Sequence, residues 1–212
     1  MNAVLFSARL LEFNLLPSLT LHPSRHEAFG APSRPVPAVC SPAWHRHWSA
    51  AILRRLSLRD RPVIDAARPE LALALLPPDR LARLARHLGA VCCAPCLRRT
   101  IAGDEVRELA AALGVDALDF ARRAETGPWS LPADQDLGPV ATLAARVDRI
   151  GRTALRAVFQ AAGPELGLRA DLKLEDDPET GEPEDVRVPP DLTLAVLETI
   201  EPTWHSSFLA MR

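Results

Sequence analysis

Apolar residues recur at steps of three and four along most of this chain, in segments that begin or end at proline or glycine. The longest such segment runs roughly from 138 to 162, and its apolar positions are Val140, Leu143, Val147, Ile150, Ala154, Val158 and Ala161. This spacing places them on one face of an α-helix. A chain of 212 residues is also long enough to bury a hydrophobic core. The pattern predicts a mainly α fold: a compact multi-helix single domain over residues 1–212.

Shorter segments repeat the same helical period, and we expect helices near 43–58, 69–76, 80–92, 105–113 and 191–200. Aspartate is a favoured N-cap residue because its carboxylate accepts a hydrogen bond from a free backbone N–H of the first turn. Asp79 and Asp104 are therefore the predicted N-caps of two of these helices. Gly114 is the predicted end of the helix that Asp104 begins.

Two segments do not follow the helical period. Residues 17–42 contain six of the twenty prolines and several apolar side chains, which predicts an irregular segment packed on the body. Further along, alternation could form one short β-hairpin near 168–188, with Val186 and Val188 pairing across from Leu168, Ala170, Leu172 and Leu174. The loop between these strands, residues 175–185, is acidic and rich in glycine and proline, so we expect it to be exposed.

The bulk composition excludes several classes of protein. Hydrophobic residues make up 48% and charged residues 25%, which is ordinary for a folded soluble chain. The net charge of −2 gives no overall attraction to nucleic acid or anionic lipid. No stretch approaches about 18 uncharged apolar residues, so we expect no membrane insertion. The apolar N-terminus carries Arg9 and Glu12 and lacks a basic start, so it is not a convincing signal peptide, and the expected compartment is the cytoplasm.

The stretch VCCAPC holds three of the four cysteines and contains a C-x-P-C spacing. A reactive dithiol needs an exposed helix N-terminus that lowers a thiol pKa, but the residues leading into this stretch are helical by period. A zinc site needs a second pair of ligands, and none is spaced to supply it. We therefore interpret these thiols as core sulfur. The alternative is a small thiol- or metal-dependent enzyme that uses Cys92, Cys93 and Cys96.

Other chemistry-bearing patterns have ordinary interpretations. Arg146, Arg149, Arg152 and Arg156 form a basic stripe that we read as a solvated face, with a nucleic-acid binder as the alternative. The histidine pair in WHRHW is two apart and does not face one side of a helix. No P-loop, GxGxxG, GxSxG or HExxH motif occurs. The sequence therefore predicts no catalytic, metal or cofactor-binding residue.

Three stretches together carry a family resemblance: FNLLPSLTLHPSR, the central segment from His87 to Trp129, and EPTWHSSFLAMR. Their shared features are the apolar spacing, the Leu88-Gly89 and Arg98-Arg99 pairs, and Gly127-Pro128-Trp129. In these features the chain resembles the SctK (YscK/PscK) family, which are accessory cytoplasmic proteins of bacterial type III secretion injectisomes. The cysteines depart from that family pattern, which does not depend on thiols at VCCAPC.

The resemblance implies a non-enzymatic scaffold of the sorting platform, without cofactors and peripheral to the inner-membrane base of the injectisome. Such a protein bridges the cytoplasmic domain of the ring protein SctD to the pod protein SctQ, and connects indirectly to the linker SctL and the ATPase SctN. The expected chemistry is recognition of proteins, and no nucleic acid is expected as a partner.

Two charged features are the candidate partner-binding residues. The first is the pair Arg98 and Arg99, which could meet an acidic partner or pair within the chain. The second is the acidic loop, which could steer toward a basic partner domain or be merely solvated: Glu175, Asp176, Asp177, Glu179 and Glu182.

Overall fold

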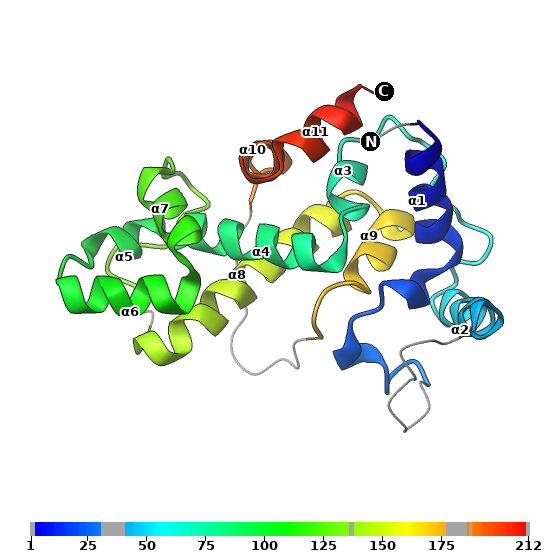
Figure 1. Ribbon diagram of the computed structural model, residues 1–212, viewed down its shortest axis with the longest axis horizontal. Coiled ribbons are helices and arrows are strands. Elements are labelled where there is room, and N and C mark those ends of the chain that lie inside the picture. Colours follow the sequence, from blue (N-terminus) through cyan, green and yellow to red (C-terminus); the bar gives the residue numbers. More distant parts are fainter. Residues whose placement is uncertain (1–2, 31–40, 136–137, 177–185, 187, 211–212) are drawn as a thin grey trace. The chain divides into compact units, whose positions relative to one another are not determined.

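The computed structural model describes residues 3–30, 41–135, 138–176, 186 and 188–210. Over these residues the chain forms α-helices and two short 3₁₀ helices and contains no β-strand (Figure 1). The prediction of a mainly α fold is confirmed. In chain order the elements are α1 (Ala3–Leu15), η1 (Pro17–Leu19), η2 (Pro23–Arg25), α2 (Pro42–Arg55), α3 (Leu71–Ala74), α4 (Pro78–Cys92), α5 (Ala94–Arg99), α6 (Gly103–Leu113), α7 (Val115–Arg123), α8 (Val140–Ala161), α9 (Pro164–Asp171), α10 (Pro190–Ile200) and α11 (Pro202–Leu209).

The chain divides into two compact units. Unit 1 takes residues 1–81, 159–178 and 197–212, and unit 2 takes residues 82–158 and 179–196. Helices α4, α8 and α10 contribute residues to both units. That residues 1–212 act as one domain stays a prediction.

Unit 1 is built around the N-terminal helices and α9. Helix α1 lies beside α2 (Figure 1). The four-residue spacing predicted for α2 turns Trp48 and Ile52 into the core, where they pack with Leu21 and Leu172. Phe29 and Trp44 are partly buried against this cluster, as a helix with one apolar face requires.

Two buried polar residues of unit 1, Asn14 and Arg169, bond to backbone groups, as burial favours. The Asn14 side-chain amide donates to the Val63 carbonyl at 2.9 Å and accepts from the Val63 N–H at 2.8 Å. Arg169 is 2% exposed, and its guanidinium donates to the carbonyls of Leu58, Arg61 and Glu165 at 2.9, 3.0 and 2.7 Å. These bonds tie α1 and α9 to the connecting segment before α3.

The described part of the proline-rich segment packs within unit 1. Leu21 is buried, and the His22 N–H donates to the Leu172 carbonyl at 2.9 Å. Proline begins each of its two 3₁₀ helices, at Pro17 and Pro23. An N–H at this first position would have no partner within the helix, so proline loses no hydrogen bond there. Residues 31–40 of the predicted irregular segment lie outside the described residues.

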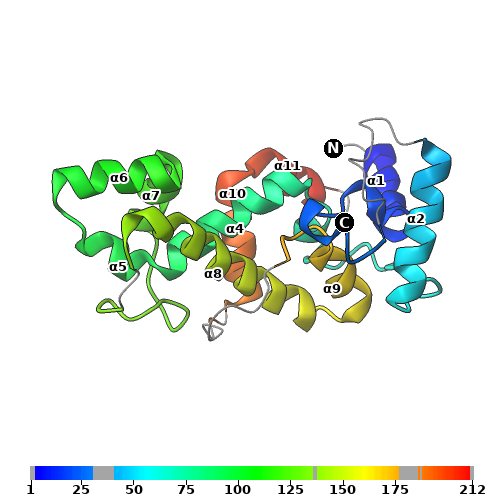
Figure 2. The ribbon, with the colours of Figure 1, turned by 90° about the horizontal axis from the view of Figure 1, so that it is seen from below.

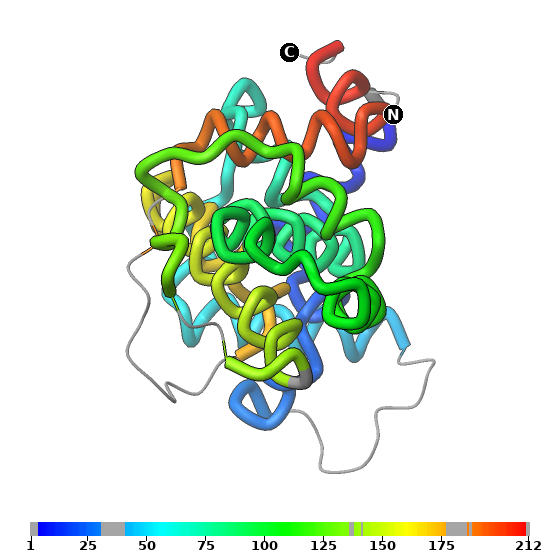
Figure 3. Tube along the Cα trace, turned by 90° about the vertical axis from the view of Figure 1, so that its left-hand side faces the viewer, coloured from blue at the N-terminus to red at the C-terminus, as the bar shows by residue number. Residues whose placement is uncertain are grey.

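Unit 2 is built from α5, α6 and α7 and from most of α4 and α8. In Figure 2, α6 and α7 lie side by side, and in Figure 3 the green coils of α5, α6 and α7 face the viewer. Helices α4 and α8 cross at two glycines with direct backbone contact. A Cβ on Gly89 would lie 1.9 Å from the Val147 carbonyl oxygen, and a Cβ on Gly151 would lie 1.7 Å from that of Ala85. Only glycine fits at either position.

The predicted hairpin is wrong in its first strand. Residues 164–171 form α9, in which Leu166 and Ala170 are buried one turn apart while Leu168 is 40% exposed. Gly167 faces the end of α8, because a Cβ there would lie 2.6 Å from the Phe159 carbonyl oxygen. Packing against α8 therefore selects the helical period over the two-residue alternation. Val186 and Val188 are buried outside any strand, and residues 177–185 lie outside the described residues.

Candidate protein-interaction surfaces

The cysteine cluster is packed into unit 2 at the junction of α4 and α5. Cys92 and Cys93 are fully buried, which confirms the core-sulfur interpretation for these two thiols. Cys96 is half-buried, and its thiol donates to the Pro132 carbonyl at 3.1 Å. Burial raises the pKa of the Cys96 thiol, and a reactive thiol needs the opposite shift. Cys40 lies outside the described residues.

No group of three histidine, cysteine or carboxylate side chains that could hold a metal ion occurs among the residues that the structure describes. The two histidines of α2 differ in surroundings. His45 lies with its Nδ1 2.9 Å from the Ser18 hydroxyl, and His47 is exposed. His87 is a buried residue of α4. Its Nδ1 donates to the Arg83 carbonyl at 2.9 Å, and burial lowers the pKa of its imidazole.

The arginine stripe of α8 is only partly open to solvent. Arg149 is exposed, whereas Arg146, Arg152 and Arg156 are half-buried, and all four take part in polar or electrostatic interactions. Nearby, Arg86 of α4 makes a bidentate ion pair with Asp148 of α8, with N–O distances of 2.8 and 2.7 Å. The half-burial of three of the four stripe arginines weakens the nucleic-acid alternative, which needs arginines available for phosphate.

The predicted partner-binding pair Arg98 and Arg99 lies at the last turn of α5. The Arg98 guanidinium donates to the carbonyls of Arg122 and Ala121 at 3.1 and 3.2 Å and also to that of Ala124. These are carbonyls at the C-terminal end of α7, which lack partners within their own helix. Arg99 donates to the Ala133 carbonyl at 3.1 Å.

Although both arginines bond internally, they remain exposed, and Ile101 beside them is 87% exposed. Arginine is enriched at interface hot spots, and an exposed apolar side chain beside it can bury area on binding. We call Arg98, Arg99 and Ile101 the α5–α6 corner. Sequence reasoning found the two arginines and missed the isoleucine.

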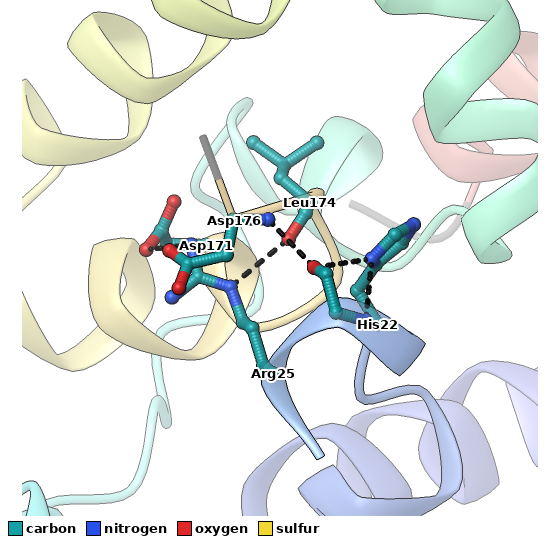
Figure 4. A network of polar contacts seen from close by, with 6 residues as sticks. His22, Arg25, Asp171, Leu174 and Asp176 are labelled. Atoms are coloured by element: carbon teal, nitrogen blue, oxygen red, sulfur yellow. Dashed lines mark hydrogen bonds and ion pairs between the residues drawn. The ribbon is translucent and has the colours of Figure 1, made fainter. Parts of the chain in front are cut away.

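The second predicted feature, the acidic loop, is described only at its entrance. Figure 4 shows how the η2 segment holds this entrance: Arg25 donates to the Leu174 carbonyl at 3.0 Å and to the Asp171 carboxylate at 2.9 Å. The Arg25 guanidinium also lies 3.4 Å from the Asp176 carboxylate, and the Asp176 N–H donates to the Ser24 hydroxyl at 2.8 Å. Glu175 and Asp176 are exposed, so their charges face solvent. The other three predicted residues, Asp177, Glu179 and Glu182, lie outside the described residues.

The only lysine of the chain, Lys173, is buried in unit 1 beside a small pocket that is also lined by Arg9 and Glu12 of α1. Its ammonium donates to the carbonyls of Ala74 and Leu76 at 2.6 and 3.0 Å, at the C-terminal end of α3. Burial lowers the pKa of this amine to about 7, with Arg9 adding to the shift and Glu12 opposing it. Sequence reasoning assigned Lys173 no role.

Comparison with known proteins identifies the central part of the chain. Residues 31–133 match the model of the family described as YOP proteins translocation protein K (YscK). The segment belongs to the YscK family. This match confirms the resemblance found in the sequence and supports a role in type III secretion. A search of curated proteins and a search of solved structures each returned no match.

The YscK segment covers helices α2 to α7. It contains the α5–α6 corner and the glycine of α4 that contacts α8, whereas α1 and the acidic loop lie outside it. Among the helices that the structure describes, none is long and apolar enough to cross a membrane.

Proposed function

We propose that this protein is a non-enzymatic scaffold of the type III secretion injectisome, which bridges the cytoplasmic domain of the ring protein SctD to the pod protein SctQ. The observation that carries this proposal is the match of helices α2 to α7 to the YscK family. Through its two partners the protein connects indirectly to SctL and the SctN ATPase at the inner-membrane base. The bridge is needed for protein secretion.

Two features of the structure support an adaptor. An adaptor needs two surfaces that can be occupied at the same time, and each compact unit offers one. Unit 2 offers the α5–α6 corner, where Ile101 can bury apolar area and the arginines can pair with a partner's carboxylates. Unit 1 offers the acidic entrance at Glu175 and Asp176, which is held in place by Arg25 and attracts a basic surface.

Binding of each partner to purified full-length protein tests the proposal. We expect the SctD cytoplasmic domain and SctQ each to be retained on immobilised protein. If neither partner is retained, and circular dichroism shows that all three proteins are folded, the proposed function is contradicted.

Charge-neutralising variants test which partner binds to which of the two surfaces. The double variant Arg98→Gln and Arg99→Gln removes both charges but keeps side chains that can donate to the α7 carbonyls. We expect it to lose one partner and keep the other. Neutralising Glu175, Asp176, Asp177, Glu179 and Glu182 together should have the converse effect.

Matched controls remove similar charges from exposed positions elsewhere. Arg107→Gln alters an exposed arginine of α6 whose carboxylate partner, Asp104, is three residues away. Glu105→Gln with Glu108→Gln removes two exposed acids of the same helix. If these controls weaken binding as much as the test variants, general charge rather than the two surfaces determines association.

A further inference from the structure

Helix α1 is apolar on two opposite faces, of which unit 1 covers only one. Phe6 and Phe13 point inward and are 9% and 5% exposed. On the other side Val4, Leu11 and Leu15 are 79%, 59% and 55% exposed. An apolar face of a helix is normally buried against another element. Among the residues that the structure describes, no element covers the outer face of α1.

The outer face has the spacing of a helix–helix seam. Val4, Ala8, Leu11 and Leu15 follow one another at steps of four, three and four, which is the repeat by which two helices pack side by side. We call these four residues the α1 seam. It contains no charge: the guanidinium of Arg9 lies 5.3 Å from the centre of the Trp204 ring, and Glu12 lies outside the seam at its flank. Covering the seam therefore buries no unpaired ion.

We propose that the α1 seam is a contact between two copies of this chain, in which α1 packs antiparallel against α1 of the partner around a two-fold axis. A two-fold contact requires one patch to be complementary to itself. The seam meets this requirement because its positions are symmetric about the middle of the helix. In the antiparallel register Val4 faces the partner's Leu15, and Ala8 faces the partner's Leu11. The small central residue thus lies opposite a large one in both halves of the contact.

The area of the seam agrees with a weak dimer. The seam exposes about 400 Å² of mostly apolar surface per copy, and Val4, Leu11 and Leu15 contribute most of it. A symmetric pair therefore buries about 800 Å², which is in the range of weak, transient contacts. We expect self-association with a dissociation constant in the micromolar range.

Sedimentation velocity of the full chain, from about 1 to about 200 µM, measures this association. We expect the wild type to shift from monomer to dimer with concentration. Leu11→Asp should stay monomeric throughout, because the dimer would bury two carboxylates near its axis. Ile64→Asp is the matched control: it alters another exposed apolar residue of unit 1, 83% exposed, and should dimerise like the wild type. Thermal melts confirm that both variants fold.

Cysteine crosslinking tests the antiparallel register, in a background with Cys40→Ser and Cys96→Ser. A mixture of Val4→Cys and Leu15→Cys proteins should crosslink between the two positions. Val4→Cys protein alone should not, because its two sulfurs lie at opposite ends of the contact.

Three outcomes overturn the proposal. A wild type that is monomeric at every concentration excludes the contact, and so does a dimer that survives Leu11→Asp. A monomer that instead loses SctD or SctQ binding on Leu11→Asp assigns the seam to a different partner. That last result leaves the bridging function intact, so the two proposals fail separately.

Discussion

The buried amine of Lys173 makes the stability of this protein depend on pH in a predictable way. The pKa of Lys173 falls from its ordinary value of 10.5 to about 7 in the folded chain. Between these two values the unfolded chain binds a proton at this residue and the folded chain does not. The free energy of unfolding therefore rises with pH across this window, by at most about 1.4 kcal/mol per pH unit. Over pH 7 to 9 the expected gain is about 2 kcal/mol, because the amine is already half-neutral at pH 7.

The variant Lys173→Met removes this dependence while keeping an unbranched apolar stem in the core. It also leaves the carbonyls of Ala74 and Leu76 without the bonds they now accept, at a cost of about 1–3 kcal/mol for each buried group. That cost is the same at every pH. The slope of stability against pH, rather than stability at one pH, therefore isolates the amine.

Urea unfolding followed by circular dichroism at pH 7, 8 and 9 measures the slope for the wild type, Lys173→Met and a packing control. The control is Leu174→Met, which alters the neighbouring buried side chain and keeps the amine. We expect the wild type and the control to gain about 2 kcal/mol from pH 7 to 9 relative to Lys173→Met. Equal slopes for all three proteins would refute the reasoning that Lys173 titrates in the folded chain near neutral pH.

Three further predictions follow from contacts of unit 2. Gly89→Ala and Gly151→Ala should each lower the free energy of unfolding by about 3 kcal/mol or more, because the new Cβ would overlap a backbone carbonyl of the facing helix; chemical denaturation measures this. Arg98→Met should lower it by about 0.5–1.5 kcal/mol, because the carbonyls at the end of α7 lose their side-chain donor. Alkylation of Cys96 by iodoacetamide in the folded protein should be slower than that of a free cysteine at pH 8, because burial raises the pKa of its thiol.

Each of these predictions has its own control. Gly103→Ala changes a glycine with no atom near its Cβ position and should leave stability almost unchanged. Arg107→Met removes an exposed arginine, for which we expect a loss below about 0.5 kcal/mol. For Cys96, unfolding in urea should restore ordinary reactivity. A folded protein that reacts faster than a free thiol would revive the dithiol interpretation.

The helical period was sufficient to predict the long helices but not their first residues. Residues 138–162 were expected to be helical, and α8 runs from Val140 to Ala161. Asp79 and Asp104 were expected as N-caps, yet both lie inside the first turn of their helices, where a carboxylate is favoured by the helix dipole. Because aspartate is favoured both at the N-cap and in the first turn, its place in the sequence cannot fix the first residue of a helix.

The sequence could not predict the contacts that show whether a residue belongs to a binding surface or to the core, because these contacts join distant segments. Lys173 donates to the Ala74 carbonyl, 99 positions earlier in the chain, and its sequence neighbours do not indicate that acceptor. Arg98 could have met a partner or the chain itself, and the choice depended on where the end of α7 falls. The α1 seam is visible in the spacing from Val4 to Leu15, but Phe6 and Phe13 offer a second apolar face. Only the tertiary structure shows which of the two is covered.

The proposed function requires this protein to link the SctD cytoplasmic domain physically to SctQ. Size-exclusion chromatography with light scattering, on SctD domain and SctQ mixed with and without this protein, tests for that link. We expect one peak whose mass requires all three components, and separate SctD and SctQ peaks when this protein is left out. If SctD and SctQ displace each other from this protein, or associate equally well without it, the protein is not the bridge.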